Sequence, residues 1–419
     1  MGICNSVKVT YKNENMTNEN FQFTRYLYPK DEVKISLMIS LLKKKEDEAV
    51  FWAYELYYSG FYDELTNLLW KIYYDFYYTL NGSFEEYLYT KLKKNLKNIQ
   101  GKEKVLYMII NNFLIRPYNL DVFTFRNITT MFAIDKKYID NIIISQINTN
   151  YDAKTEIKYD KVLLELLYNK NYLLLAEFIM NDVIDSSLES ILTKILGYFS
   201  KRGVKINTKK EVELFEKMGQ IVNKRILLVS KIMRYALLIN NALAKFGKNI
   251  YVQAQDEDVV MYETIQADLT LKKTMFTPIL PAYKVLPLAT FYYIDKDNYL
   301  SLFKLKRESI NIKDVYYYEW LYYCYDTPVW FERITKHTGY KDEEKNTIEF
   351  TDSDLEDEFY SLYNYETDEQ KKEVQQKTIQ DIIEKREWVD FYDEFHNKDN
   401  SLLDEDSAEF IENFDKIKY

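Results

Sequence analysis

The stretch Glu46–Asn81, EDEAVFWAYELYYSGFYDELTNLLWKIYYDFYYTLN, contains the pattern that decides the fold. Gly60 is the one glycine in this stretch, and the stretch has no proline, so it predicts two helices, 46–59 and 61–80, with Gly60 just after the C-cap of the first. A short connection between two such helices predicts an antiparallel hairpin. The second helix has apolar residues spaced for one buried face: Leu65, Leu68, Leu69, Ile72 and Phe76.

The rest of the chain extends this pattern, because only nine glycines and six prolines interrupt 419 residues. Ser83 with Glu86 predicts a capping box at the start of another helix, and Ser186 with Glu189 predicts one for 184–199. The sequence therefore predicts a mainly α protein of stacked helical hairpins, HEAT-like or an irregular bundle, with no clean sequence repeat. Further helices are predicted at 31–45, 102–115, 158–180, 312–325, 328–338, 353–363, 368–396 and 401–417.

The segment 248–312 differs from its surroundings. It holds three of the six prolines and has β-rich runs at 289–294 and 299–304, which predict a small β or irregular insertion. Four parts follow from these patterns. They are a flexible N-terminal arm at 1–22, a helical-hairpin domain at 23–247 that ends in a basic helix, the insertion at 248–312, and an acidic helical domain at 313–419.

Charge is unevenly distributed along the chain. The net charge is −10, but residues 1–250 sum to +8 and residues 251–419 to −18. A basic half can bind an anionic partner, and an acidic half can itself be such a partner. The 40 tyrosines have two interpretations. They reflect the A/T-rich codons of an AT-rich genome, or they form a tyrosine-rich surface for protein contacts.

Several classes of protein are disfavoured by missing motifs. No GxxxxGK[ST] or GxGxxG is present, so a phosphate-binding loop is not expected. Neither HExxH nor CxxC occurs, which argues against a zinc site. Two cysteines, no signal peptide and no apolar run long enough to span a bilayer predict a soluble, intracellular protein. We expect no cofactor, no metal and no enzymatic activity, and no motif identifies a small-molecule substrate. An enzyme on an unfamiliar helical fold stays open as an alternative.

Two patterns suggest a catalytic or a metal-binding site, but a structural interpretation is preferred for each. A nucleophilic pair of Cys324 and His337 is conceivable, but Cys324 within an aromatic run is typical of a small core residue. Asp352, Asp354 and Glu356 begin like a calcium loop, yet Asp357 replaces the glycine that the sixth position requires. An acidic helix start is the preferred interpretation.

The N-terminus, MGICNS, matches the myristoylation pattern. Gly2 would carry the acyl chain after removal of the methionine, and Cys4 could take a second one. A short pattern of this kind also arises when Met-Gly is left over from cloning. One acyl chain binds membranes only marginally, so a basic patch would be the second signal.

Such a basic patch is predicted at 208–234. Thr208 and Glu211 form a capping box, and a helical pattern follows to about 247. The lysine stripe, defined as Lys210, Lys217, Lys224, Lys231 and Arg234, would follow one face of that helix, because a seven-residue interval drifts only about 20° per step. The stripe is either a solvated face or a surface for the phosphates of nucleic acid or anionic lipid. Gly219 could interrupt the helix and split the stripe.

Two parts of the chain resemble uncharacterised helical proteins of giant, nucleocytoplasmic large DNA viruses. The first includes FTRYLYPKDEV at 23–33 and the stretch Glu46–Asn81, and the second is TPVWFERITKHTG at 327–339. The resemblance covers about a third of the chain and implies no activity or site residue. Together with the charge pattern it predicts a non-enzymatic interaction or scaffold protein of a large DNA virus. Two alternatives stay open: a nucleic-acid-associated accessory factor in replication, transcription or translation, and a myristoylated membrane-peripheral virion protein.

Overall fold

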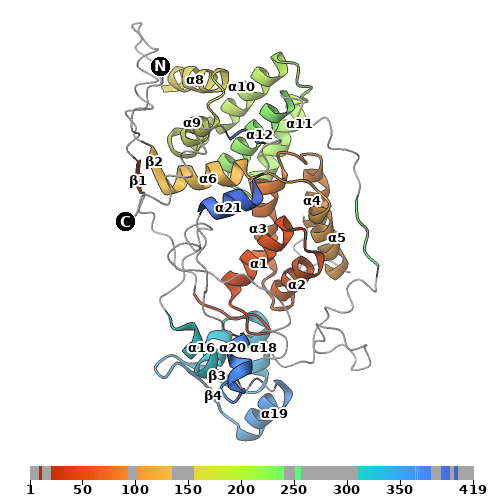
Figure 1. Cartoon of the computed structure of the whole chain (residues 1–419), viewed down its shortest axis with the longest axis vertical. Coiled ribbons are helices and arrows are strands. Elements are labelled where there is room, and N and C mark those ends of the chain that lie inside the picture. Colours follow the sequence, from red (N-terminus) through yellow and green to blue (C-terminus); the bar gives the residue numbers. More distant parts are fainter. Residues whose placement is uncertain are drawn as a thin grey trace.

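The computed structural model describes residues 9–11, 20–92, 102–134, 155–239, 251–255, 310–363, 365, 367–378, 388–396 and 401–403. Over these residues the protein is mainly helical, as predicted, and its helices pack as a bundle (Figure 1). Its strands there form two small antiparallel sheets of two strands each. The predicted β runs at 289–294 and 299–304 lie outside the described residues.

The first helices form the middle of the molecule in Figure 1. α3 continues without a break into a π-helical turn, Tyr73–Tyr77, so the predicted helix 61–80 is regular only in its first half. α6 was not predicted, since no helix was predicted between 102–115 and 158–180. The bounds are α1 Lys30–Leu42, α2 Glu46–Tyr58, α3 Tyr62–Ile72, α4 Phe84–Leu92, α5 Lys102–Leu114 and α6 Asp121–Met131.

The end of α2 confirms the predicted role of Gly60. Its φ is +91°, in the left-handed region, and its N–H donates to the Tyr57 carbonyl at 3.0 Å. The next N–H, of Phe61, donates to the Leu56 carbonyl at 3.1 Å. This pair of bonds is the Schellman motif, in which glycine avoids the steric cost of a positive φ.

Two other helices end in the same motif with lysine in the glycine position. Lys44 follows α1 with a φ of 58°, and Lys170 follows α8 with a φ of 56°. The N–H of Lys44 donates to Leu41, and the N–H of the next residue to Ser40. Lys170 ends α8 inside the predicted helix 158–180. That prediction was therefore wrong as a single helix, because lysine is not a recognisable stop signal.

The next group of helices lies at one end of the molecule (Figure 1). Its bounds are α8 Thr155–Tyr168, α9 Tyr172–Glu177, a π turn Phe178–Asp182, a 3₁₀ turn Asp185–Ser187, α10 Leu188–Lys201, α11 Thr208–Met218 and α12 Lys224–Ile239. Two predicted caps shift by one residue. Ser187 rather than Ser186 precedes α10, and Asn207 rather than Thr208 caps α11, its side chain accepting from the Lys210 N–H.

The C-terminal part lies largely at the opposite end of the molecule, except for α21, which returns to the middle (Figure 1). Its elements are α16 Ile312–Tyr318, α17 Trp320–Cys324, α18 Pro328–Lys336, β3 Gly339–Asp342, β4 Thr347–Phe350, α19 Ser353–Tyr363, α20 Lys372–Thr378 and α21 Trp388–Phe395. The β3–β4 hairpin was not predicted. Residue 319 interrupts the predicted helix 312–325. Residues 379–387 belong to the predicted helix 368–396 and lie outside the described residues.

The ends of the chain depart from prediction where they are described. Residues 9–11, placed in a flexible arm, form β1 and pair with β2, Phe132–Ile134. Residues 401–403 begin the predicted helix 401–417 but are not helical, and the rest of it is not described. They are tied to α6 instead. Buried Asp121 accepts hydrogen bonds from Ser401 Oγ at 2.6 Å and Leu402 N at 2.9 Å.

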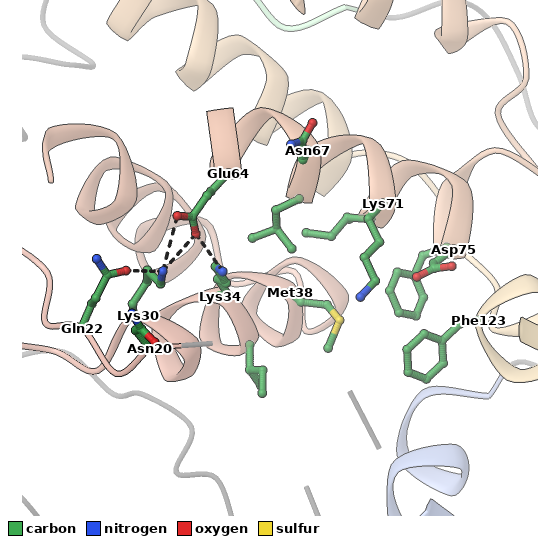
Figure 2. Close-up of a pocket in the computed structure, with 14 residues that line it drawn as sticks. Asn20, Gln22, Lys30, Lys34, Met38, Glu64, Asn67, Lys71, Asp75 and Phe123 are labelled. Carbon is green, nitrogen blue, oxygen red and sulfur yellow. Dashed lines mark hydrogen bonds and ion pairs between the residues drawn. The ribbon is translucent and has the colours of Figure 1, made fainter. Parts of the chain in front are cut away.

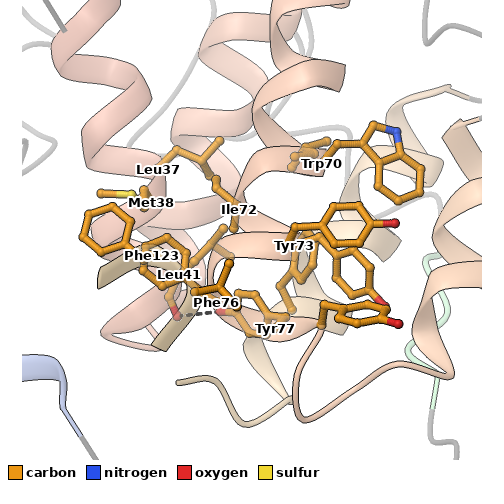
Figure 3. Packing of buried hydrophobic residues seen from close by; sticks show 14 of the residues in the cluster. Leu37, Met38, Leu41, Trp70, Ile72, Tyr73, Phe76, Tyr77 and Phe123 are labelled. Atoms are coloured by element: carbon orange, nitrogen blue, oxygen red, sulfur yellow. Dashed lines mark hydrogen bonds between the residues drawn. The ribbon is translucent and has the colours of Figure 1, made fainter. Parts of the chain in front are cut away.

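One continuous hydrophobic core joins both predicted helical domains. Figure 3 shows part of it, where Leu37 of α1 lies beside Ile72 and Leu41 of α1 lies beside Phe76 and Tyr77. Tyr77 is fully buried, and its hydroxyl donates to the Leu41 carbonyl at 3.4 Å. Of the five residues predicted for the buried face of 61–80, four are buried and Leu68 is half-buried.

Residues 21–28 join the N-terminal helices to α18. Thr327 Oγ1 donates to the Phe23 carbonyl at 2.6 Å, and Trp330 Nε1 to the Thr24 carbonyl at 3.1 Å. The N–H of Val329 donates to the Ser59 carbonyl at 3.2 Å. A Cβ on Gly60 would lie 2.6 Å from the Cβ of Pro328, so only glycine allows α18 to approach this closely.

Candidate functional site

The predicted lysine stripe does not lie on one helix. α11 ends at Met218, and α12 begins at Lys224 after a turn at Gly219. Ion pairs join Lys224 to Glu216 at 2.7 Å and Lys231 to Glu211, so the two helices run antiparallel. Of the two outcomes left open by the sequence, the break at Gly219 is the one observed, and it splits the stripe. The physical reason is that the apolar face of α12 turns back into the core.

Lys231 is the clearest departure from the predicted surface stripe, because it is almost fully buried. Its ammonium pairs with Glu211 and donates to the Tyr78 hydroxyl at 3.1 Å. Burial would lower its pKa, but the carboxylates of Glu85 and Glu211 hold the pKa above its ordinary value. Glu85 itself is buried and accepts from Tyr74 at 2.6 Å. This network ties α4, the π turn, α11 and α12 together.

The other members of the stripe also have partners within the chain. Lys210 pairs with Glu86 at 2.8 Å, Lys217 lies over the Tyr89 ring at 3.6 Å, and Arg234 donates to the Thr79 carbonyl at 3.0 Å. Anion binding by the exposed members of the stripe stays a prediction. Gly2 and Cys4, the candidate lipidation residues, lie outside the described residues.

Cys324 and His337 are both buried in the C-terminal part. Burial raises the pKa of the Cys324 thiol well above its ordinary value, and a thiol of that kind is a poor nucleophile. The His337 Nδ1 lies 2.7 Å from the Arg333 carbonyl, and its ring packs against Phe359. These contacts favour the core interpretation of both side chains.

A cavity of about 660 Å³ lies between α1 and α3. Its volume falls in the range of small-molecule sites, about 300–1,000 Å³. The α1 residues that line it recur at helical spacing, as do those of α3, and Phe123 of α6 closes one end (Figure 2). The lining consists of Asn20, Gln22, Lys30, Lys34, Ile35, Met38, Glu64, Asn67, Leu68, Lys71, Ile72, Asp75, Phe76 and Phe123.

Polar groups gather at one end of the cavity. Figure 2 shows Gln22, Lys30, Lys34 and Glu64 together. Glu64 Oε2 lies 2.9 Å from Lys34 Nζ and 3.4 Å from Lys30 Nζ. Burial alone would raise the pKa of Glu64, but the two ammonium groups hold it below its ordinary value. The Glu64 side chain is 41% exposed, whereas those of Lys30 and Lys34 are 8% and 12% exposed.

The other end of the cavity adjoins the π-helical turn. Asp75 lies in this turn, and both of its oxygens are held by Arg126, at 2.9 Å from Nε and 2.8 Å from Nη2. Such a bidentate pair neutralises a buried carboxylate and fixes its orientation. π-helical turns inside α-helices often occur at functional sites. Met38, Phe76 and Phe123 make this end largely apolar.

One rim of the cavity is connected to the C-terminal part. Lys30 Nζ donates to Gln22 Oε1, and Gln22 Nε2 donates to the Asp326 carbonyl at 2.8 Å. Asp326 in turn accepts from Lys341 of β3 at 3.0 Å. This chain of hydrogen bonds links α1 to the β3–β4 hairpin.

The hairpin and α19 form an acidic surface, which we call the acidic unit and define as residues 339–363. It has nine acidic residues and two lysines, and none of the nine is buried. Exposed apolar side chains accompany them. Tyr340, 50% exposed, lies opposite Glu349 in the hairpin, and Leu362, 55% exposed, follows Glu358 by one turn of α19.

Over the described residues, no helix is long and apolar enough to cross a membrane. The same part of the chain has no group of three His, Cys, Asp or Glu side chains arranged to hold a metal ion. The cavity was not predicted, because the fold assembles it from separate segments, whereas the acidic unit lies within the predicted acidic domain at 313–419. Comparison of the chain with protein-family models, curated proteins and solved structures gives no match.

Proposed function

We propose that the protein is a non-enzymatic interaction protein that binds a basic protein partner through the acidic unit. The observation that carries the proposal is the combination of net charge and exposed apolar side chains in residues 339–363. Complementary charge gives specificity and fast association, and the exposed side chains of Tyr340 and Leu362 add apolar contact area. The buried contacts of residues 21–28 with α18 support a fixed orientation of this surface.

The resemblance to giant-virus proteins supports a setting for this activity. We propose that the protein acts inside the host cell, in the cytoplasm, a viral factory or the virion. The partner would then be a basic viral or host protein. The alternative of a nucleic-acid factor receives less support, because the lysine stripe is divided between two helices and Lys231 is buried.

The test is affinity capture with the full chain and with a charge-reversed variant. Asp357→Lys with Glu358→Lys changes two exposed residues of α19, and we expect it to lose the basic partner that the parent chain retains. Glu189→Lys with Glu213→Lys makes the same change in charge at exposed positions of α10 and α11, and should retain it. Nuclease treatment should leave capture unchanged. Equal capture by all three chains, or loss on nuclease treatment, contradicts the proposal.

A further inference from the structure

The cavity between α1 and α3 has the two properties of a site for an amphipathic ligand, a charged end and an apolar end. We propose that it binds an organic anion with a hydrocarbon tail, and that the anionic group replaces the Glu64 carboxylate on Lys30 and Lys34. This site is separate from the acidic unit, and the inference does not depend on the proposed function.

The sign of the ligand's charge follows from the lining. Three lysines, at positions 30, 34 and 71, face two carboxylates, Glu64 and Asp75. Arg126 takes both oxygens of Asp75, so that carboxylate is neutralised from outside the lining. Among the described lining residues, positive charge therefore exceeds negative charge, which favours an anion over a cation.

Glu64 occupies the position that the anionic group would take. Its oxygens lie within 3.4 Å of both ammonium groups, yet its side chain is 41% exposed while the two lysines are almost buried. A ligand anion would have to displace this carboxylate from the two ammonium groups, which are held in the wall. A ligand carboxylate or phosphate would then receive the two charge-assisted hydrogen bonds.

The tail would lie along the apolar end. Met38, Phe76 and Phe123 are almost fully buried and border the cavity, and half-buried Leu68 adds to its side. Figure 2 shows Met38 and Phe123 away from the Lys30–Glu64 end, with Lys71 between them. Each methylene group buried there strengthens binding by about fourfold, which makes a head group without a tail a poor ligand.

The experiment uses the full chain and calorimetric titration with four probes. Dodecanoate and dodecyl phosphate carry the tail with two different anionic groups, and whichever binds tighter identifies the preferred head. Inorganic phosphate lacks the tail, and dodecyltrimethylammonium has the opposite charge. We expect binding of one or both amphipathic anions and at least about tenfold weaker binding of the other two probes.

The variants separate a ligand site from a structural cavity. Lys34→Ala should weaken binding of the preferred anion by about tenfold or more, since it removes a charged hydrogen bond. Leu68→Trp should weaken binding, because the larger ring takes part of the space that the tail would fill. Glu64→Gln should strengthen binding several-fold, because it removes the competing charge. Lys209→Ala, at an exposed position of α11 outside the cavity, should leave binding unchanged.

Glu64→Gln tests the proposal even if another variant folds poorly. If Glu64 only stabilises the fold, this substitution gives no gain in affinity for the amphipathic anion. Unchanged or weaker anion binding by Glu64→Gln overturns the proposal. So does equal binding of the cationic amphiphile, or no heat of binding with either amphipathic anion.

Discussion

Replacing Gly60 with alanine tests whether the contact between α2 and α18 holds the two parts of the molecule together. Gly60 has a φ of +91°, and an added Cβ would meet the Cβ of Pro328 at 2.6 Å. Real carbon atoms do not approach this closely, and the obstacle is a rigid ring next to backbone. α18 must therefore move away, which lengthens the hydrogen bond from the Val329 N–H to the Ser59 carbonyl.

The expected cost has two parts. A left-handed backbone costs a residue with a side chain about 1–2 kcal/mol. Overpacking of a close contact adds about 1–3 kcal/mol. Gly60→Ala should therefore lower the free energy of unfolding by about 2–5 kcal/mol.

Gly203 provides a matched control. Its φ is +92°, and an added Cβ would have no neighbour within 4 Å. Gly203→Ala should therefore cost only the backbone part, about 1–2 kcal/mol. Urea denaturation monitored by tryptophan fluorescence measures both variants. Equal destabilisation by the two substitutions would refute the reasoning, because it would leave no cost for the contact with Pro328.

Three further predictions concern buried charges. Burial raises the pKa of Asp121 to about 6, so its ionisation favours unfolding and the folded state loses stability as pH rises toward 6. Relative to Asp121→Asn, the parent chain should lose about 2 kcal/mol between about pH 4 and pH 7, measured by urea midpoints, and a constant difference would contradict this. Arg126→Met leaves Asp75 buried without its bidentate partner and should cost about 3–5 kcal/mol in the same assay, whereas a neutral effect would count against the pair. Lys231→Met should be strongly destabilising, and adding Glu211→Leu should recover part of the loss; full additivity in thermal unfolding would disprove their coupling.

The sequence predicts those parts of the fold that depend on local signals. Gly60 marks the end of α2 because only glycine adopts its backbone conformation without strain. The spacing of Leu65, Leu69 and Ile72 identifies the buried face of α3, because helical periodicity is a short-range property. Asn171 offered one neglected signal, since its side chain caps α9 by accepting from the Leu174 N–H.

Other parts depend on contacts between distant segments and leave weak local signals. The β3–β4 hairpin has a turn residue at Asn346, with a φ of 53°, and the alternating run Thr347–Phe350, but four residues between two helices are easily missed. Lys231 was assigned to the surface from its spacing alone. It is buried because Glu211 and Tyr78 meet it from other elements.

The cavity depends both on local helix spacing and on contacts between distant segments. Lys30 and Lys34 share a helix face, as do Glu64 and Lys71, and each pair alone is typical of a solvated surface. The packing of α1 near α3 brings these charges together, and Arg126 of α6 neutralises Asp75. No pattern within a single segment predicts this arrangement.

Hydrogen exchange of the full chain, with and without its captured basic partner, tests the central claim most directly. The account predicts slower exchange of backbone amides in residues 339–363 when the partner is bound, with unchanged exchange in α11 and α12. Protection confined to α11 and α12, with residues 339–363 unchanged, would contradict it.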